Sequence, residues 1–188
     1  MKYDPSTKEV SVVIDGFYFA NGIALSKDED YVIVCESWKF RCRKYWLEGE
    51  KKGQLEIFID NLPGGPDNIN IAPDGNFWIS LIKMNATGVQ ALHNCSDNKI
   101  LLAAYPELIG LLIPMGITAP ATAVKVTTDG EIIMEYSDPN ATYISFVTSS
   151  LEYEGNLYMA STNANFLRKL PLDSNGKLPF NSKLYSLV

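Results

Sequence analysis

The sequence predicts an all-β fold, because short apolar strands and tight turns alternate along almost the whole chain. An acidic turn followed by a strongly apolar strand recurs along it, which indicates either a β-sandwich or a β-propeller. The 188 residues are 46% hydrophobic and 20% charged, a balance typical of a soluble globular domain with a real core. This composition excludes a disordered chain, a collagen-like chain and a disulfide-dense miniprotein.

The first half of the chain is divided into predicted strands by turns rich in Gly, Pro, Asn and Asp. Asp15-Gly16 and Asp74-Gly75 are typical of tight turns, because glycine adopts the positive φ that such turns require. The predicted strands cover residues 9–15, 22–26, 31–36, 40–47, 54–59, 69–72 and 77–82.

The second half predicts further strands at residues 123–127, 132–135, 143–147, 157–160 and 166–170. Before them lies a nearly continuous apolar segment, 100–117, whose length alone is that of a membrane span. Pro106 and Pro114 interrupt this segment, and Glu107 inside it is charged. We therefore predict one short helical insertion near 100–117, beginning close to Pro106, that covers one face of the sheets.

The length of the chain fits about three blades, if the fold is a propeller. A blade takes about 40–50 residues in the familiar repeats, and propellers close with about 4–8 blades. We therefore expect residues 1–188 to form one domain that is only part of a ring. An open ring exposes two blade faces, so we expect poor solubility or self-association of this chain through those faces.

Charge and cysteine content argue against nucleic-acid binding and against a thiolate zinc site. The net charge is −6 and no basic stripe is present, so nucleic acid is not an expected partner. Three cysteines form no CxxC motif, which argues against a thiolate zinc site. Cys35 and Cys42 fall in one predicted strand pair, where they form either a disulfide or two buried thiols.

Three N-x-S/T sequons, at Asn85, Asn94 and Asn140, exceed the number expected by chance and indicate a secretory route with glycosylation. The N-terminal residues contain no apolar stretch of the kind that signal peptides carry. The sequence therefore predicts either a cytosolic protein or a chain whose true N-terminus lies further upstream.

The motifs of nucleotide-binding, serine hydrolase and zinc protease chemistry are absent from the sequence. His93 is the only histidine, and its polar surroundings favour a solvated loop residue over a catalytic base. Asn21, Asp67 and Asn68 lie in two short stretches that have two interpretations. They form local turns, or they supply hard oxygen ligands to Ca²⁺ at the starts of two inner strands.

A resemblance to a known family rests on an ordered set of short stretches that spans nearly the whole chain. The stretches are Tyr3-Asp4-Pro5-Ser6-Thr7-Lys8, Phe19-Ala20-Asn21-Gly22, Ser26-Lys27-Asp28-Glu29, Arg43-Lys44-Tyr45-Trp46-Leu47, Gly53 and Asn61-Leu62-Pro63-Gly64-Gly65-Pro66-Asp67-Asn68-Ile69. In this order they resemble the strictosidine synthase-like family, which is related to the calcium-dependent paraoxonases and gluconolactonases. The resemblance implies a six-bladed β-propeller, of which this chain matches the C-terminal half.

The resemblance also implies a function and a set of site residues. Asn21, Asp67 and Asn68 match metal ligands of the calcium-dependent relatives, whose remaining ligands and catalytic histidines belong to the N-terminal half. The implied activity is Ca²⁺-dependent hydrolysis of a small-molecule ester or lactone, with a non-catalytic propeller holding a structural metal as an alternative. The implied compartment is the endoplasmic reticulum, the vacuole or the extracellular space, and membrane association is implied through a segment N-terminal to this chain.

Thr148 bears on the activity after which the family is named. Strictosidine synthase condenses tryptamine with secologanin and needs a Glu just upstream of an aromatic-acid-Gly-x-Leu-Tyr strand. That strand matches Tyr153-Glu154-Gly155-Asn156-Leu157-Tyr158, and the Glu position falls at Thr148. A threonine cannot accept a proton from an amine near neutral pH as a carboxylate can, so we expect no condensation activity.

Overall fold

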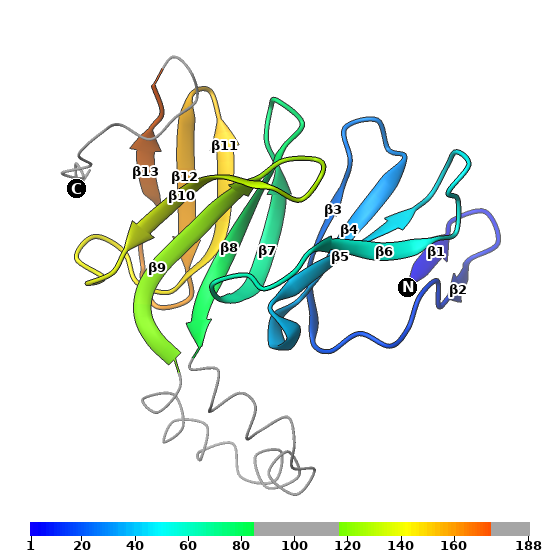
Figure 1. Cartoon of the computed structure of the whole chain (residues 1–188), viewed down its shortest axis with the longest axis horizontal. Helices are drawn as coiled ribbons and strands as arrows, with labels where there is room; N and C mark the ends of the chain where they lie inside the picture. The colour runs from blue at the N-terminus through cyan, green and yellow to red at the C-terminus, as the bar shows by residue number, and fades with distance from the viewer. Residues whose placement is uncertain (85–116, 174–188) are drawn as a thin grey trace, which may run out of the picture.

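The computed structural model describes residues 1–84 and 117–173, which form three antiparallel sheets and a separate hairpin (Figure 1). Blade A contains β3 (Ala20–Leu25), β4 (Tyr31–Glu36), β5 (Arg41–Trp46) and β6 (Leu55–Ile59). Blade B contains β7 (Gly65–Ile71), β8 (Phe77–Met84), β9 (Ile117–Val126) and β10 (Ile132–Asp138). Blade C contains β11 (Val147–Tyr153), β12 (Asn156–Ser161) and β13 (Arg168–Pro171). The hairpin pairs β1 (Lys2–Asp4) with β2 (Glu9–Ser11), and a 3-10 turn, η1 (Ser37–Lys39), joins β4 to β5.

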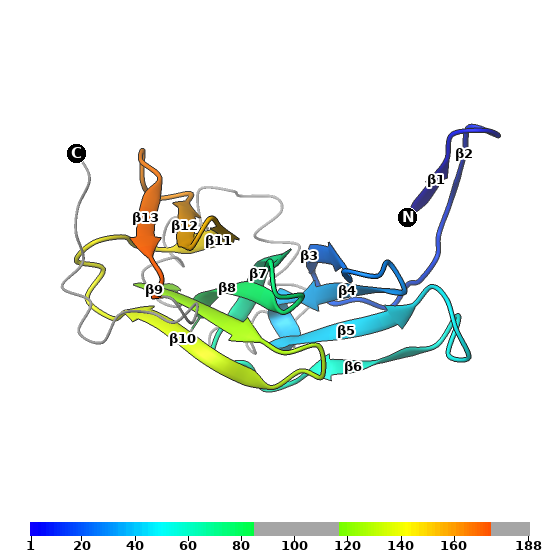
Figure 2. The ribbon, with the colours of Figure 1, turned by 90° about the horizontal axis from the view of Figure 1, so that it is seen from above.

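Each blade is a meander in which strands consecutive in sequence are neighbours in the sheet. β7 contacts both β3 and β11, so the first strands of the three blades lie next to one another. Figure 2 shows β3 and β7 on one side of the row of sheets, with the last strands β6 and β10 on the opposite side. The prediction of consecutive antiparallel blades, with the strands near 22–26 and 69–72 side by side, is confirmed.

One predicted strand, at 143–147, is wrong. The structure places β11 at Val147–Tyr153 instead and leaves the preceding residues in a loop. The carboxylate of Asp138 accepts hydrogen bonds from the backbone N–H groups of Thr142, Tyr143 and Ile144. These N–H groups are therefore unavailable to a neighbouring strand, and local side-chain bonding competes with sheet pairing.

Other boundaries differ less from the expectation. The first predicted strand, at 9–15, ends at Ser11, and the structure adds β1 before it. The helical insertion predicted near 100–117 lies outside the described residues, apart from Ile117, where β9 begins. The described ranges contain no helix with the length and hydrophobicity of a transmembrane segment.

Blades A and B are joined by an apolar core, whereas blades B and C share a partly polar one. The first core contains Ile33, Phe58, Phe77, Ile79 and Val124. At the second interface, Lys125 Nζ lies 2.8 Å from both Asp74 Oδ2 and Glu152 Oε2, and Trp78 Nε1 donates to Glu152 Oε2 at 2.8 Å. Burial alone would lower the pKa of Lys125, but the hydrogen bonds to these two carboxylates raise it. The buried cation is thus paired, as its burial requires.

The outer faces of the terminal blades carry exposed apolar side chains. On blade C, Leu151, Tyr153 and Leu167 are 48%, 57% and 64% exposed and line a shallow apolar hollow. On blade A, Ile23 and Ile57 are 65% and 49% exposed. These residues are where the expected self-association would occur, and the oligomeric state of the chain stays a prediction.

Candidate metal site at the inner strands

The three sequence-predicted ligands and Thr148 lie at corresponding places, near the starts of β3, β7 and β11. Each place is an irregularity in the sheet, because the strand register shifts between Ala20 and Ile23, between Pro66 and Ile69, and between Val147 and Ser149. Asn21 with Gly22, the Asp67-Asn68 pair and Thr148 are the residues inside these shifts. Bulges re-aim side chains and are common next to active sites, so the repeated irregularity marks this end of the inner strands.

Hydrogen bonds connect these residues across all three blades. Asn68 Nδ2 donates to the carbonyl oxygen of Thr148 at 2.8 Å and to Asp67 Oδ1 at 3.3 Å. The Asn21 amide also lies close enough to the Asp67 carboxylate to lower the pKa of that group, and Ser37 links Asn21 to the Pro66 carbonyl on β7. The structure therefore brings Asn21 on blade A together with the adjacent residues Asp67 and Asn68 on blade B.

Gly22 explains how β3 and β7 come so close. A Cβ atom on Gly22 would lie 2.4 Å from the Asp67 carbonyl oxygen and 2.7 Å from the Ile69 nitrogen. Only glycine leaves room for such an approach of two backbones. The alternative interpretation of these stretches as turns is not supported, because Asn21-Gly22 and Asp67-Asn68 all lie within strands.

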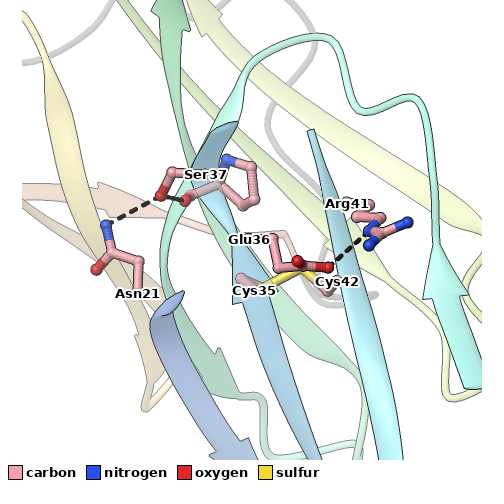
Figure 3. The surroundings of a disulfide bond; sticks show 7 residues. Asn21, Cys35, Glu36, Ser37, Arg41 and Cys42 are labelled. Atoms are coloured by element: carbon pink, nitrogen blue, oxygen red, sulfur yellow. Dashed lines mark hydrogen bonds and ion pairs between the residues drawn. A yellow bond between two sulfur atoms is a disulfide. The ribbon is translucent and has the colours of Figure 1, made fainter. Parts of the chain in front are cut away.

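Both asparagine side chains are oriented by fixed acceptors of their amide nitrogens. Asn21 Nδ2 donates to Ser37 Oγ at 3.2 Å, and Figure 3 shows the amide oxygen of Asn21 turned away from Ser37. Asn68 uses its nitrogen for Thr148 and Asp67. Two amide oxygens and one carboxylate are hard ligands of the kind that Ca²⁺ prefers.

The electrostatics of Asp67 also fit a bound cation. Burial raises the pKa of Asp67, and the hydrogen bond from Asn21 opposes that shift. None of the ion pairs formed within residues 1–84 and 117–173 includes this carboxylate. A half-buried carboxylate without a positive partner is destabilised in its charged form, and a cation in contact with it would remove that penalty. The donor set therefore suits a metal ion, with Asp67 as its charged member.

The remaining sequence-predicted residues have separate outcomes. Thr148 Oγ1 donates to the Ala160 carbonyl at 3.4 Å, so the hydroxyl faces β12. Asn140 is exposed in the loop after β10, whereas His93 and the sequons at Asn85 and Asn94 lie outside the described residues.

Cys35 and Cys42 face each other across β4 and β5 as a disulfide, which resolves the choice between a bridge and two thiols.

Sequence reasoning missed Ser37. This serine is 3% exposed and contacts both ligand-bearing strands, through Asn21 on β3 and the Pro66 carbonyl on β7. No short-range pattern marks it, because both partners are distant in sequence. Only its place directly after a cysteine-bearing strand could have drawn attention to it.

Comparison with known proteins agrees with this architecture. The family model for strictosidine synthase matches residues 1–50. The bovine adipocyte plasma membrane-associated protein is 33% identical over 174 residues, which are 92% of this chain and 42% of that protein. Strictosidine synthase-like protein 3 of Arabidopsis thaliana is 31% identical over 181 residues, covering 89% of this chain and 43% of that protein.

This chain is a homologue of the strictosidine synthase-like proteins. It spans less than half the length of the curated relatives that it matches. Among solved structures, a luciferin-regenerating enzyme superposes with a TM-score of 0.54 at 18% identity, over 86% of this chain and 43% of that one. A gluconolactonase from Xanthomonas campestris superposes with a TM-score of 0.52 at 12% identity, over 85% and 40%. At these identities the structural likeness establishes the β-propeller fold and nothing finer.

Proposed function

We propose that the protein containing this strictosidine synthase-like segment is a Ca²⁺-dependent hydrolase of small esters or lactones. The observation that carries the proposal is the convergence of Asn21, Asp67 and Asn68 at the irregular starts of two neighbouring inner strands. A bound Ca²⁺ would polarise a substrate carbonyl and stabilise the developing oxyanion. Asp67 supplies the only formal negative charge of the three ligands, and the asparagines contribute neutral oxygens.

The residues of this chain have two tasks in that proposal. Asp67 would hold the cation electrostatically, and Asn21 and Asn68 would add neutral amide oxygens once their nitrogens release the Asp67 carboxylate, the Asn21 nitrogen staying on Ser37 and the Asn68 nitrogen on the Thr148 carbonyl. Asp67 is the only charged ligand that this chain would supply, so its contribution leaves positive charge on the ion, which carbonyl polarisation requires. A lactone is the class of substrate to test first, because one structural neighbour is a gluconolactonase.

Thr148 argues against amine–aldehyde condensation as the activity. It lies at the third strand irregularity, beside Asn68. The family resemblance places the carboxylate base of strictosidine synthase at this position. Its hydroxyl instead donates to Ala160 on β12, and a hydroxyl does not take a proton from an amine at neutral pH. The residue type at this place therefore favours hydrolysis over condensation.

Hydrolysis is tested in a chimera in which residues 1–188 replace the matching segment of the bovine relative. We expect cleavage of phenyl acetate or a lactone that is lost in chelator, restored by Ca²⁺ and abolished by Asp67→Asn. The 188-residue chain alone is expected to be inactive, and neither form should condense tryptamine with secologanin. Hydrolysis indifferent to both chelator and Asp67→Asn would contradict the proposal. Ca²⁺ binding without hydrolysis of any substrate would support a structural metal instead.

We also propose that the protein resides in the secretory pathway or at the cell surface. The Cys35–Cys42 disulfide and the exposed sequon at Asn140 support an oxidising compartment with glycosylation. One mammalian relative is named as plasma membrane-associated. Mass spectrometry of the protein from its native tissue should find the Cys35–Cys42 peptide disulfide-linked, and recovery of both cysteines as free thiols would refute the assignment.

A further inference from the structure

The turn from Cys35 to Cys42 contacts both inner strands that carry the candidate ligands, and the hydrolase proposal leaves its role open. We call it the disulfide-closed turn, because Cys35 on β4 and Cys42 on β5 are joined across its base. Figure 3 shows the turn directly beside Asn21, with the Ser37 side chain pointing toward the asparagine amide.

The Ser37 hydroxyl fixes which way the Asn21 amide faces. Ser37 Oγ donates its single proton to the Pro66 carbonyl oxygen at 2.5 Å, on β7 next to Asp67. A hydroxyl whose proton is engaged can only accept further hydrogen bonds. It can therefore receive the Asn21 Nδ2 donor, at 3.2 Å, but it cannot donate to the Asn21 amide oxygen. The Asn21 nitrogen is consequently held at Ser37 with its second hydrogen available to the Asp67 carboxylate, and its oxygen faces away from Ser37 (Figure 3).

Several buried contacts hold the disulfide-closed turn itself in place. The Ser37 N–H donates to the Phe19 carbonyl oxygen at 3.1 Å, just before β3. Glu36 has no exposed surface, and its carboxylate accepts from the Tyr18 N–H at 2.9 Å and from Arg41 Nε at 2.6 Å. The turn is thus fastened to the segment that leads into β3, in addition to its contact with β7. Ser37 has little freedom to move away from Asn21.

We infer that Ser37 is a positioning residue for the candidate cation site, acting through the Asn21 amide and held by the disulfide-closed turn. This inference rests on the proposed function, because it assumes that Asn21 is a cation ligand. Second-layer partners of metal ligands commonly determine ligand orientation in this way. Ser37 itself touches neither the cation nor the substrate in this arrangement.

The test measures Ca²⁺ binding to the 188-residue chain by isothermal titration calorimetry. Ser37→Ala is expected to weaken Ca²⁺ affinity about tenfold, the lower end of the effect of second-layer substitutions. Ser80→Ala is the matched control, because Ser80 is equally buried and hydrogen-bonds Ser150 at the interface of blades B and C. We expect Ser80→Ala to leave the affinity unchanged. We expect Ser37→Ala to have no further effect in an Asn21→Ala background, because its effect passes through Asn21.

A second measurement does not depend on Ca²⁺. The side-chain amide resonances of Asn21 in a nitrogen–proton correlation spectrum should shift in Ser37→Ala and stay in place in Ser80→Ala. Unchanged Asn21 resonances, or an effect of Ser37→Ala on affinity that persists in Asn21→Ala, would overturn the inference. If the amide shifts as expected but the parent chain binds no Ca²⁺, the proposed cation site fails while Ser37 still orients Asn21.

Discussion

Replacing Asp67 by Ala is expected to weaken Ca²⁺ binding on the order of 100-fold, the largest effect of any single ligand substitution. The reason is charge, because Asp67 is the only ionisable member of the ligand set and the number of charged ligands strongly tunes calcium affinity. At about ten times its dissociation constant, Ca²⁺ should stabilise the parent chain by roughly 1.4 kcal/mol. Thermal melts with and without Ca²⁺ would show this stabilisation in the parent chain and none in Asp67→Ala.

Asp60→Ala provides the matched control, since Asp60 is an exposed aspartate in the same part of the chain. It should retain the full Ca²⁺-dependent shift in melting temperature. If Asp67→Ala also retains the shift, the ion binds elsewhere and the site assignment is wrong. Asn21→Ala and Asn68→Ala should fall between the two, because each removes a neutral ligand.

The raised pKa of Asp67 adds a pH dependence with a definite sign. Because burial makes the folded state hold this proton more tightly than the unfolded state, the charged carboxylate destabilises the cation-free fold above its folded pKa. That destabilisation is relieved as pH falls through the folded pKa, which lies above the usual 3.8. Ca²⁺ binding needs the carboxylate, so affinity should decline over the same pH range.

Replacing Gly22 by Ala should destabilise the fold by about 3 kcal/mol or more. The new Cβ would lie 2.4 Å from the Asp67 carbonyl oxygen and 2.9 Å from the Asn68 Cα, and backbone atoms of a paired strand cannot rotate away. Overpacking of a rigid site costs about 1–3 kcal/mol and sometimes more. Whole domains are stable by only about 5–15 kcal/mol, so the loss would be large in urea denaturation. Ca²⁺ affinity should fall as well, because β7 must shift.

Gly155→Ala separates crowding from loss of glycine. Gly155 has φ of +70° but open space where a Cβ would lie, so only backbone conformation is strained there. We expect a cost of about 1–2 kcal/mol, the usual penalty for an L-residue in the left-handed region. A Gly22→Ala variant no less stable than Gly155→Ala would show that β3 and β7 can separate at little cost.

Most of the strand pattern followed from local sequence, because alternating apolar residues and glycine or proline turns act over a few positions. Asp74-Gly75 between the predicted strands at 69–72 and 77–82 is one example, and the structure pairs β7 with β8 across it. The strand predicted at 143–147 failed for the opposite reason. Its backbone N–H groups are captured by Asp138, a contact that depends on how the loop folds back rather than on propensity.

The candidate ligands were also visible in the sequence, but their arrangement was not. Residue type marked Asn21, Asp67 and Asn68 as carriers of side-chain oxygens, and the family resemblance alone favoured them as ligands and identified Thr148 as the residue without a carboxylate. Their meeting depends on Gly22, whose missing side chain lets two distant strands touch. Local strand and turn patterns report only on pairing within one sheet. They could not reveal that β3 and β7, which belong to different sheets, touch.

The sequence by itself determined the β-rich composition, the turn positions, the chemical types available at the site and the resemblance to a propeller family. The tertiary structure decided that Asn21, Asp67 and Asn68 meet, that Cys35 and Cys42 are bridged, and that Ser37 links β3 to β7. The physical reason is range. Turn and strand preferences arise from neighbouring residues, whereas the orientation of Asn21 is set by a serine hydroxyl whose proton is held by a carbonyl on another blade.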